Sequence, residues 1–361
     1  MTHRIHNFSA GPGALPLPVL ERAQADLVDF AGSGMSLMEM SHRGPIYEAV
    51  HAQVTADLRS LLGIPDNYRV LYMQGGARGQ FAMVPMNLLG DGLAQYIDTG
   101  TWASGALEEA GKIGRTECLW SSRDSGYRSV PRPEEAVGSP DAAYLHFTSN
   151  NTIYGTQYHH LPDSKGAPLV CDMSSDILSR TVDVSRYALI YAGAQKNMGP
   201  AGVTVVIVRD DLLARSGDQL PETMNYRKVA AKDSMLNTPP TFAIYMVGLV
   251  AAYLLEQGGV PAMSAINDRK AESIYRVVDG SGGFYTGHAV PTSRSSMNVT
   301  FRTPSKDLDR LFVQESAAAG LDGLKGHRSV GGLRASIYNA VREESVLALV
   351  DFMADFMARK G

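Results

Sequence analysis

Cysteine is scarce in this chain of 361 residues, which contains only Cys118 and Cys171. Two cysteines are too few for a disulfide framework, and their spacing matches no metal-binding motif. Both lie within or next to apolar runs, as reduced and buried thiols do. This pattern is typical of a cytoplasmic protein, so we expect a cytoplasmic location and no metal site.

Long hydrophobic runs and blocks of one charge are also missing. The most apolar window, residues 241–255, is too short to span a bilayer and is typical of a buried helix. The first ten residues hold no long apolar stretch, so we expect neither a signal peptide nor a membrane partner. The 33 basic and 37 acidic residues are mixed along the chain and give a formal net charge of −4, which argues against nucleic acid as a partner.

The hydrophobic content of 44% and charged content of 19% are typical of a globular protein with a large core. Up to about residue 257, short β-rich runs alternate with helical patterns, and several runs lack the polar alternation of half-exposed strands. The candidate strands are residues 69–73, 94–98, 116–120, 143–147, 168–172, 188–192 and 203–208. This order predicts an α/β fold with a mostly parallel seven-stranded sheet flanked by helices.

The end of the chain has a different pattern, which predicts a small α+β domain. Its candidate helices are residues 260–278, 306–319 and 343–358, and its candidate strands are residues 297–301 and 333–337. Earlier in the chain, residues 45–62 place apolar side chains at helical spacing behind Pro45, which fits a first helical turn. We predict a large cofactor-binding domain of residues 16–257, and a small domain of residues 1–15 and 258–361.

An acid and a lysine follow two neighbouring apolar runs. Asp172 ends the run at 168–172, and Lys196 follows the run at 188–192 in a turn rich in glycine and alanine. Open α/β sheets bind ligands at the carboxyl ends of their strands. A carboxylate that keeps a pyridine nitrogen protonated and a lysine that forms a Schiff base are the pair that pyridoxal phosphate requires. Alone, such a pair would be a helix cap and a solvated charge, but the small residues around Lys196 indicate a closely approaching ligand.

A glycine-rich turn at residues 75–79 lies between a predicted strand and a helix that begins near residue 80. Backbone amides at such a helix start bind phosphate well, although an ordinary glycine turn is an equal alternative. The spacing matches neither the Walker nor the dinucleotide motif, which argues against a nucleotide enzyme.

Seven segments together resemble the phosphoserine aminotransferase family. They are Ser-Ala-Gly-Pro at 9–12, Met-Ser-His-Arg-Gly at 40–44, Gly-Gly-Ala-Arg-Gly at 75–79, Asp-Met-Ser-Ser at 172–175, Gly-Ala-Gln-Lys-Asn at 193–197, Asn-Thr-Pro-Pro at 237–240 and Gly-His-Arg at 326–328. Individually several are common, but in this order they cover nearly the whole chain. The family belongs to the class V aminotransferases of fold type I.

The resemblance implies the reaction and the assembly. Family members are cytoplasmic homodimers that use pyridoxal 5′-phosphate to exchange glutamate and 3-phosphohydroxypyruvate with 2-oxoglutarate and phosphoserine in serine biosynthesis. Bacterial members are also associated with the analogous step on 4-phosphohydroxythreonine in pyridoxine biosynthesis. The expected kinetics are ping-pong.

The resemblance also implies roles around the cofactor. Lys196 would form the Schiff base and move the proton, and Asp172 would pair with the pyridine nitrogen. The remaining cofactor contacts would be Trp102 on the ring face, Thr152 at the phenolic oxygen, Ala77, Arg78 and Gln195 at the phosphate, and Asn237 and Thr238 of the partner subunit at the same phosphate. Many members have glycine where this chain has Ala77, but a backbone amide survives that change. Without the resemblance, Trp102 would be a core aromatic, Thr152 a turn hydroxyl and 237–240 a stiff loop.

Substrate choice depends on binding two anionic groups, which favours guanidinium side chains. By resemblance, Arg334 would bind the α-carboxylate and Arg43 the glutamate side, near Ser9 or Ala10. His42, Arg43, His327 and Arg328 would surround the distal phosphate or γ-carboxylate. Many members have serine where this chain has Ala10. Any one arginine could instead be a solvated surface charge, but several glycines lie around Arg328 and Arg334.

Two other kinds of function remain as alternatives. Another class V enzyme would have the same fold; a cysteine desulfurase needs a nucleophilic cysteine late in the chain, and neither Cys118 nor Cys171 is placed for that. A transaminase for uncharged substrates would not need the paired histidines and arginines. A non-catalytic protein that binds a phosphorylated metabolite would leave the spacing of Asp172 and Lys196 unexplained.

Overall fold

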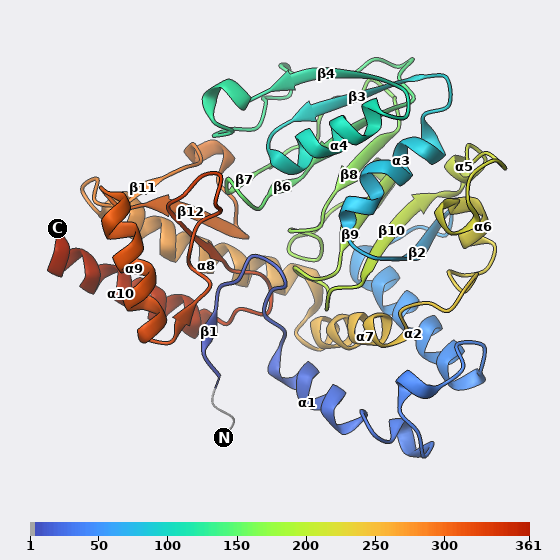
Figure 1. Cartoon of the computed structure of the whole chain (residues 1–361), viewed down its shortest axis with the longest axis horizontal. Coiled ribbons are helices and arrows are strands. Elements are labelled where there is room, and N and C mark those ends of the chain that lie inside the picture. Colours follow the sequence, from blue (N-terminus) through green and yellow to red (C-terminus); the bar gives the residue numbers. More distant parts are fainter. Residues whose placement is uncertain (1–3) are drawn as a thin grey trace.

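A seven-stranded sheet runs through the centre of the computed structural model, which describes residues 4–361 (Figure 1). Its strands lie in the order β2, β10, β9, β8, β5, β3, β4, and only β10 runs antiparallel to its neighbours. The bounds are β2 Tyr68–Gln74, β3 Leu93–Asp98, β4 Arg115–Ser121, β5 Tyr144–Thr148, β8 Leu169–Asp172, β9 Leu189–Gly193 and β10 Val203–Arg209. The predicted sheet is confirmed, because each of the seven predicted runs overlaps one strand.

Two apolar layers cover the two faces of this sheet, which explains why its central strands carry few polar residues. One layer contains α1 (Leu17–Ala25), α2 (Pro45–Leu62) and α7 (Thr241–Glu256). The other contains α3 (Gln80–Leu88), α4 (Thr101–Gly111), α5 (Asp210–Leu213) and α6 (Tyr226–Ala230). Helix α2 has the predicted bounds; Pro45 lies in its first turn, and Gly63 ends it with a left-handed φ of 59°.

The C-terminal part of the chain has its own apolar core, to which Phe8 also belongs. Strands β11 (Thr286–Gly287), β12 (Asn298–Arg302) and β14 (Leu333–Ser336) form an antiparallel sheet. Helices α8 (Gly259–Gly280), α9 (Lys306–Ala318) and α10 (Glu343–Lys360) pack around it, and β1 (His6–Asn7) pairs in parallel with β13 (Leu321–Asp322). These elements match the predicted small α+β region. The division into domains at residue 257 stays a prediction, and residues 1–3 of the predicted small domain lie outside the described residues.

Short elements connect these layers. Strands β6 (Asn150–Asn151) and β7 (Thr156–Gln157) form a two-stranded pair directly after β5. The 3-10 helices are Phe30–Gly32, Leu37–Glu39, Ala77–Gly79, Arg123–Ser125, Val184–Arg186, Glu222–Met224 and Pro291–Ser293. Of these, Ala77–Gly79 lies in the predicted glycine-rich turn and leads into α3, which begins at Gln80 as predicted.

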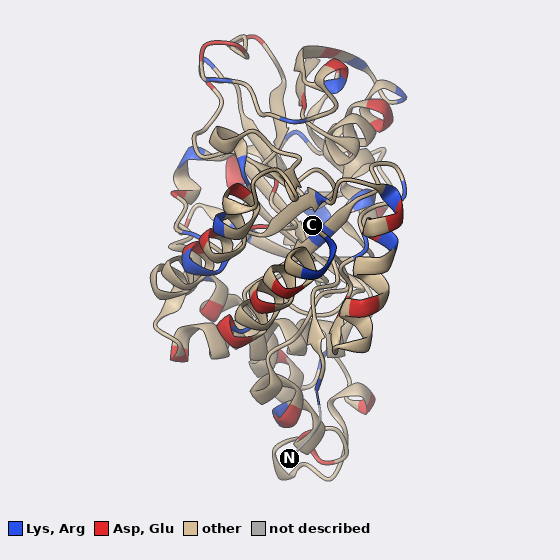
Figure 2. Ribbon diagram, turned by 90° about the vertical axis from the view of Figure 1, so that its left-hand side faces the viewer, with Lys and Arg blue, Asp and Glu red and all other residues tan. Residues whose placement is uncertain are grey.

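Charged residues of both signs are interspersed over the helices (Figure 2). Along residues 4–361, no single helix has both the length and the apolar character needed to cross a membrane. Helices α7 and α8 reach that length and hydropathy only as a pair, which is bent by 83°.

Candidate active site

The candidate site lies at the carboxyl edge of the large sheet. Strand β8 ends at Asp172, and its parallel neighbour β9 ends at Gly193, three residues before Lys196. Since parallel neighbours end at the same edge, the acid and the lysine are delivered to one place, as the sequence predicted.

Lys196 is held in a half-buried position. Its Nζ donates a hydrogen bond of 2.7 Å to Thr152 Oγ1 and lies 5.6 Å from the centroid of the Trp102 ring. Burial lowers the pKa of Lys196 to about 8, with Arg334 acting in the same direction and Asp172 acting against it. Near neutral pH a useful fraction of this amine is therefore unprotonated and nucleophilic.

Asp172 is buried, with 6% of its surface exposed. Its Oδ1 accepts hydrogen bonds from the backbone N–H of Ser174 at 2.9 Å and from Ser174 Oγ at 2.6 Å. Ser174 Oγ in turn accepts from the backbone N–H of Gly193 at 3.0 Å, which ties the ends of β8 and β9 together. Burial raises the pKa of Asp172, whereas Lys196 and Ser174 lower it. The two ionisable groups thus act on each other across one site.

The glycine-rich turn meets the segment that carries Lys196. A Cβ atom on Gly193 would lie 2.7 Å from Gln195 Oε1 and 3.3 Å from the Ala77 Cβ, so a larger residue there would displace the Gln195 side chain. The Arg78 guanidinium lies 5.8 Å from the centroid of the Trp102 ring. Ala77, Arg78, Trp102 and Gln195 therefore surround the same space as Lys196.

Residues 237 and 238 lie next to this turn within one chain. Gln74, which ends β2, donates a hydrogen bond of 2.8 Å from its Nε2 to the Thr238 carbonyl oxygen. Asn237 lines a neighbouring cavity of about 230 Å³ together with Gln74 and Met83. Their predicted role across a subunit interface stays a prediction.

Arg334 reaches the site from β14. Its Nη1 lies 3.4 Å from the Thr152 carbonyl oxygen, and its buried Nε has no hydrogen-bond partner among the described residues. Burial lowers the pKa of Arg334. A buried guanidinium edge without a partner, next to Lys196, is suited to an anionic ligand.

The N-terminal segment also lies against Lys196. A Cβ on Gly11 would lie 3.3 Å from Lys196 Cγ, and the Gly13 N–H donates to the Gln195 carbonyl oxygen at 2.8 Å. Ser9 and Ala10 directly precede this contact. A Cβ on Gly323, the residue after β13, would lie 2.8 Å from Ser9 Oγ, so Ser9 also packs closely against the end of that strand.

His327 lies near Arg334, whereas Arg328 points to solvent. Both side chains come from the loop between β13 and β14. His327 lines a small hollow with Arg334, and burial, Arg334 and Arg328 all lower the pKa of His327. Arg328 is exposed and lines a groove of about 580 Å³ between this loop and α9, which His327 also lines.

His42 and Arg43 are not brought to Lys196 within one chain. They belong to the segment between α1 and α2, and Figure 1 shows this segment on the side of the molecule away from α9 and α10. His42 is buried, and its Nε2 has no partner in the part of the chain that the structure describes; Arg43 is exposed. From within this subunit, therefore, these two residues do not complete the site.

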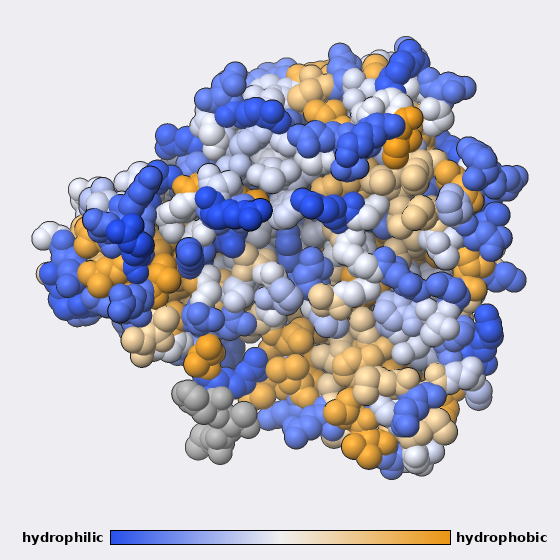
Figure 3. All heavy atoms as spheres, viewed as in Figure 1, coloured by the Kyte–Doolittle hydropathy of each residue, from blue (hydrophilic) through white to orange (hydrophobic). Residues whose placement is uncertain are grey.

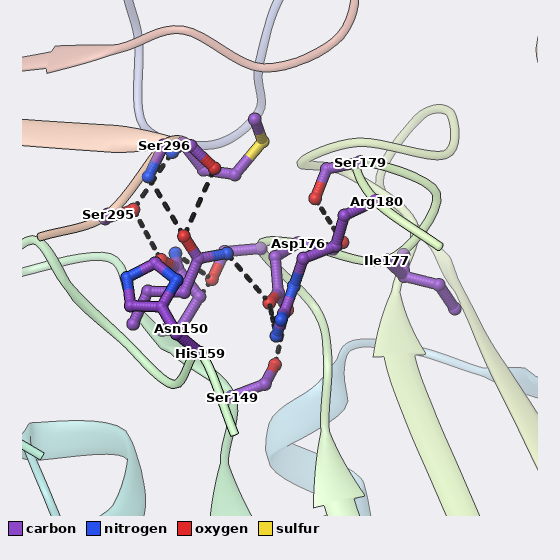
Figure 4. Close-up of polar contacts among 12 residues, drawn as sticks. Ser149, Asn150, His159, Asp176, Ile177, Ser179, Arg180, Ser295 and Ser296 are labelled. Atoms are coloured by element: carbon purple, nitrogen blue, oxygen red, sulfur yellow. Dashed lines mark hydrogen bonds and ion pairs between the residues drawn. The ribbon is translucent and has the colours of Figure 1, made fainter. Parts of the chain in front are cut away.

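A polar network behind the site was not predicted from the sequence (Figure 4). Asp176, 3% exposed, accepts hydrogen bonds from Ser149 Oγ, from Gln157 Nε2 at 3.1 Å and from Arg180 Nη2 at 3.3 Å. The Ser149 N–H also donates to the Asp172 carbonyl oxygen at 3.0 Å. The network thus connects the loop of Asp172 with the loop that carries Thr152. The four-residue spacing of Asp176 and Arg180 was the one signal in the sequence for it.

The chemistry of this site fits pyridoxal phosphate. Three polar atoms around Lys196 are buried without a partner in residues 4–361: Trp102 Nε1, Gln195 Oε1 and Arg334 Nε. An amine of lowered pKa, a buried carboxylate, an indole face and a glycine-rich turn match an aldehyde, a pyridine nitrogen, an aromatic ring and a phosphate respectively. No group of three or more His, Cys, Asp or Glu side chains that could hold a metal ion occurs within the described residues.

Comparison with known proteins agrees with this chemistry. The model of the class V aminotransferase family matches residues 5–349. The chain belongs to the class V aminotransferases.

It is 54% identical over 362 residues to a phosphoserine aminotransferase of Niallia circulans, with all of both chains covered. The solved phosphoserine aminotransferase from Bacillus circulans subsp. alkalophilus is similar with a TM-score of 0.97, 54% identity and complete coverage of both chains. A phosphoserine aminotransferase from Trichomonas vaginalis, solved with pyridoxal phosphate bound, has a TM-score of 0.92 and 40% identity, with 97% of this chain and 100% of that one covered.

This class V aminotransferase therefore depends on pyridoxal phosphate and has the fold-type I architecture that the sequence predicted. The predicted resemblance to the phosphoserine aminotransferase family is also confirmed. The individual roles of the site residues stay predictions.

Proposed function

We propose that this enzyme transfers the amino group of glutamate to 3-phosphohydroxypyruvate, giving 2-oxoglutarate and phosphoserine for serine biosynthesis. The observation that carries the proposal is the buried Arg334 Nε beside Lys196, which has no partner among the described residues and is suited to a substrate carboxylate next to the reacting amine. The names of relatives 52–54% identical over nearly the whole chain support the phosphorylated substrate.

When bound, pyridoxal phosphate supplies an aromatic ring that withdraws electrons from the substrate Cα. We assign Asp172 to the protonated ring nitrogen, Trp102 to the ring face and Thr152 to the phenolic oxygen. Ala77, Arg78 and Gln195 would hold the phosphate, with Asn237 and Thr238 of the partner subunit. The positions of the Trp102 ring, 5.6 Å from Lys196 Nζ, and of Thr152 Oγ1, 2.7 Å from the same nitrogen, support the assignments of these two residues.

Lys196 has two tasks in this proposal: it holds the cofactor and it moves a proton at the substrate Cα. Its Nζ is kept at 2.7 Å from Thr152 Oγ1, which fixes the position of the amine. Because burial lowers the pKa of Lys196 to about 8, the amine accepts and returns a proton at physiological pH without a large free-energy cost. The two half-reactions follow one another, with 2-oxoglutarate leaving before the keto acid binds.

The two anionic ends of the substrate would be bound by different groups. Arg334 is assigned to the α-carboxylate, with Ser9 and Ala10 nearby. His327 and Arg328, together with His42 and Arg43 of the partner subunit, would bind the distal phosphate or the γ-carboxylate of glutamate. The substrate of pyridoxine biosynthesis, 3-hydroxy-2-oxo-4-phosphobutanoate, carries the same two anions, so we include it and its product 4-phosphohydroxythreonine.

A homodimer in the cytoplasm is part of the proposal, and the surface supports the dimer. Six large apolar side chains between residues 17 and 46 are exposed: Leu17, Leu27, Val28, Met35, Met38 and Ile46. Figure 3 shows an apolar area on the lower part of the molecule. Such an area is typical of a subunit interface. A second copy seated there would cover the segment of His42 and Arg43 and could receive both side chains.

The function is tested by transamination of 3-phosphohydroxypyruvate and pyruvate with glutamate, read from the cofactor spectrum and from product. We expect kcat/KM to be at least roughly a hundredfold higher for the phosphorylated acid, since charge-assisted hydrogen bonds favour it. Arg328→Ala should reduce kcat/KM for 3-phosphohydroxypyruvate but leave that for pyruvate within about twofold. Arg186→Ala, an exposed arginine in the large sheet region, is the control. Equal rates with both acids in the unmodified enzyme would contradict the proposed function.

A further inference from the structure

The side chain of Tyr338 lies where the N-terminal segment meets the C-terminal core. Tyr338 is fully buried, two residues after β14, and its hydroxyl donates a hydrogen bond of 2.7 Å to the Ala10 carbonyl oxygen. Its ring packs against Gly13, where a Cβ would lie 2.9 Å from a ring carbon. The hydroxyl also accepts from Asn298 Nδ2 at 3.3 Å. The Tyr338 side chain therefore holds the peptide after Ala10, which belongs to the N-terminal segment that contacts Lys196.

The backbone around Tyr338 is itself fixed. The buried Lys270 donates hydrogen bonds from its Nζ to the carbonyl oxygens of Ile337, Tyr338 and Val341, at 2.9, 2.9 and 3.0 Å. The next residue, Asn339, donates from its N–H to Asn197 Oδ1 at 2.9 Å, directly beside Lys196 in the chain. The Tyr338 hydroxyl is consequently held at a constant position relative to Lys196.

The hydrogen bond to Ala10 also determines the direction of another group. The peptide between Ala10 and Gly11 is trans, so its C=O and N–H point in opposite directions. Holding the Ala10 carbonyl oxygen toward Tyr338 therefore turns the Gly11 N–H away from Tyr338. That N–H forms no hydrogen bond with any described residue, and Gly11 packs on Lys196 Cγ. An oriented backbone N–H without a protein partner, beside the Lys196 side chain, is suited to binding an anion.

We propose that the Gly11 N–H binds a carboxylate of the amino-acid substrate and that Tyr338 is the positioning residue that orients it. This rests on the proposed function only in requiring an amino donor with a carboxylate beside Lys196. Tyr338 acts through the Ala10–Gly11 peptide; its hydroxyl also lies near Arg334 and Thr152, and its pKa, which burial raises, is lowered by both. Because the hydroxyl donates to Ala10 and not to Lys196, we expect it to contribute more to substrate affinity than to the proton transfer at Lys196.

The test compares Tyr338→Phe with Tyr285→Phe in the holoenzyme. Tyr285 is a matched control, because its buried hydroxyl also donates to a backbone carbonyl oxygen, that of Met353 at 2.8 Å, but within the C-terminal core. We expect Tyr338→Phe to raise the KM for glutamate and the Kd for maleate, a non-reacting dicarboxylate, by roughly fivefold. The kcat should stay within about twofold, and Tyr285→Phe should change neither constant.

Equal changes in the two variants, or a fall in kcat at unchanged KM, would overturn the proposal. A second measurement needs no variant: hydrogen exchange of the Gly11 N–H in the unmodified holoenzyme should slow when maleate binds, and unchanged exchange also overturns it. Both measurements use glutamate or maleate alone. If 3-phosphohydroxypyruvate proves not to be a substrate, the proposed function fails while the result for Tyr338 still stands.

Discussion

The pKa of the Lys196 amine results from several effects, some of which lower it while others raise it. Burial and the neighbouring Arg334 lower its pKa, whereas Asp172 raises it. The loss of hydration is the largest of these, so the ammonium form is disfavoured despite the nearby carboxylate. Arg334 thus helps to keep the amine unprotonated, in addition to the role in binding an anion that we propose for it.

The pH dependence of this amine follows from the direction of its pKa shift. Since the pKa of Lys196 is lowered to about 8, its neutral fraction should rise from roughly a tenth at pH 7 to nine tenths at pH 9. Covalent capture of pyridoxal phosphate by the apoenzyme should accelerate over the same range. Stopped-flow absorbance measures this rate. Asp172→Asn removes a charge that raises the pKa, so its midpoint should lie lower, and Arg334→Gln should move it higher. A midpoint above pH 10 in the unmodified enzyme would contradict the assignment.

At the scale of elements, the patterns that depend on neighbouring residues were predictable. All seven strands of the large sheet and helix α2 could be predicted from the spacing of apolar residues, because an element buried on one or both faces has a regular apolar pattern in its sequence. The strands β1 and β13 have only two residues each, which is too short for such a pattern. Asp176 and Tyr338 were missed for another reason: their partners Ser149 and Ala10 lie 27 and 328 residues away along the chain. No local pattern encodes such a contact.

Helix α8 supports the site through the buried side chain of Lys270, which donates hydrogen bonds to three backbone carbonyl oxygens after β14. In Lys270→Met these carbonyl groups lose their donor, and each buried, unpaired group costs about 1–3 kcal/mol. With partial relaxation, we expect a loss of about 2–4 kcal/mol in the free energy of unfolding, measured by urea denaturation. Lys232→Met, an exposed lysine, should change it by less than about 0.5 kcal/mol. Similar losses in both variants would show that Lys270 does not hold this segment.

At the scale of the whole molecule, one chain assembles only part of the predicted site. Lys196, Asp172, Trp102, Thr152, Gln195 and Arg334 come together, whereas His42 and Arg43 lie on a distant segment beside exposed apolar residues. The order of motifs along a sequence does not say which copy of the chain supplies each one. The place of this segment within one subunit, together with the exposed apolar area, favours supply from a second copy.

Mixing two inactive variants tests this arrangement. Lys196→Ala lacks the reacting amine, and Arg43→Ala lacks a group that we assign to the other copy's site. In a mixed dimer, one site then carries both defects and the other carries neither, because the two residues of each site come from different chains. Random exchange of subunits should restore activity to about a quarter of that of the unmodified enzyme, measured with glutamate and 3-phosphohydroxypyruvate. Lys196→Ala mixed with Arg334→Ala is the control: both residues would act in the same chain's site, so every mixed dimer keeps one defect per site and stays inactive. No restoration by the test pair despite proven exchange would place Arg43 outside the partner's site. Restoration by the control pair would show that Lys196 and Arg334 do not act in the same chain's site.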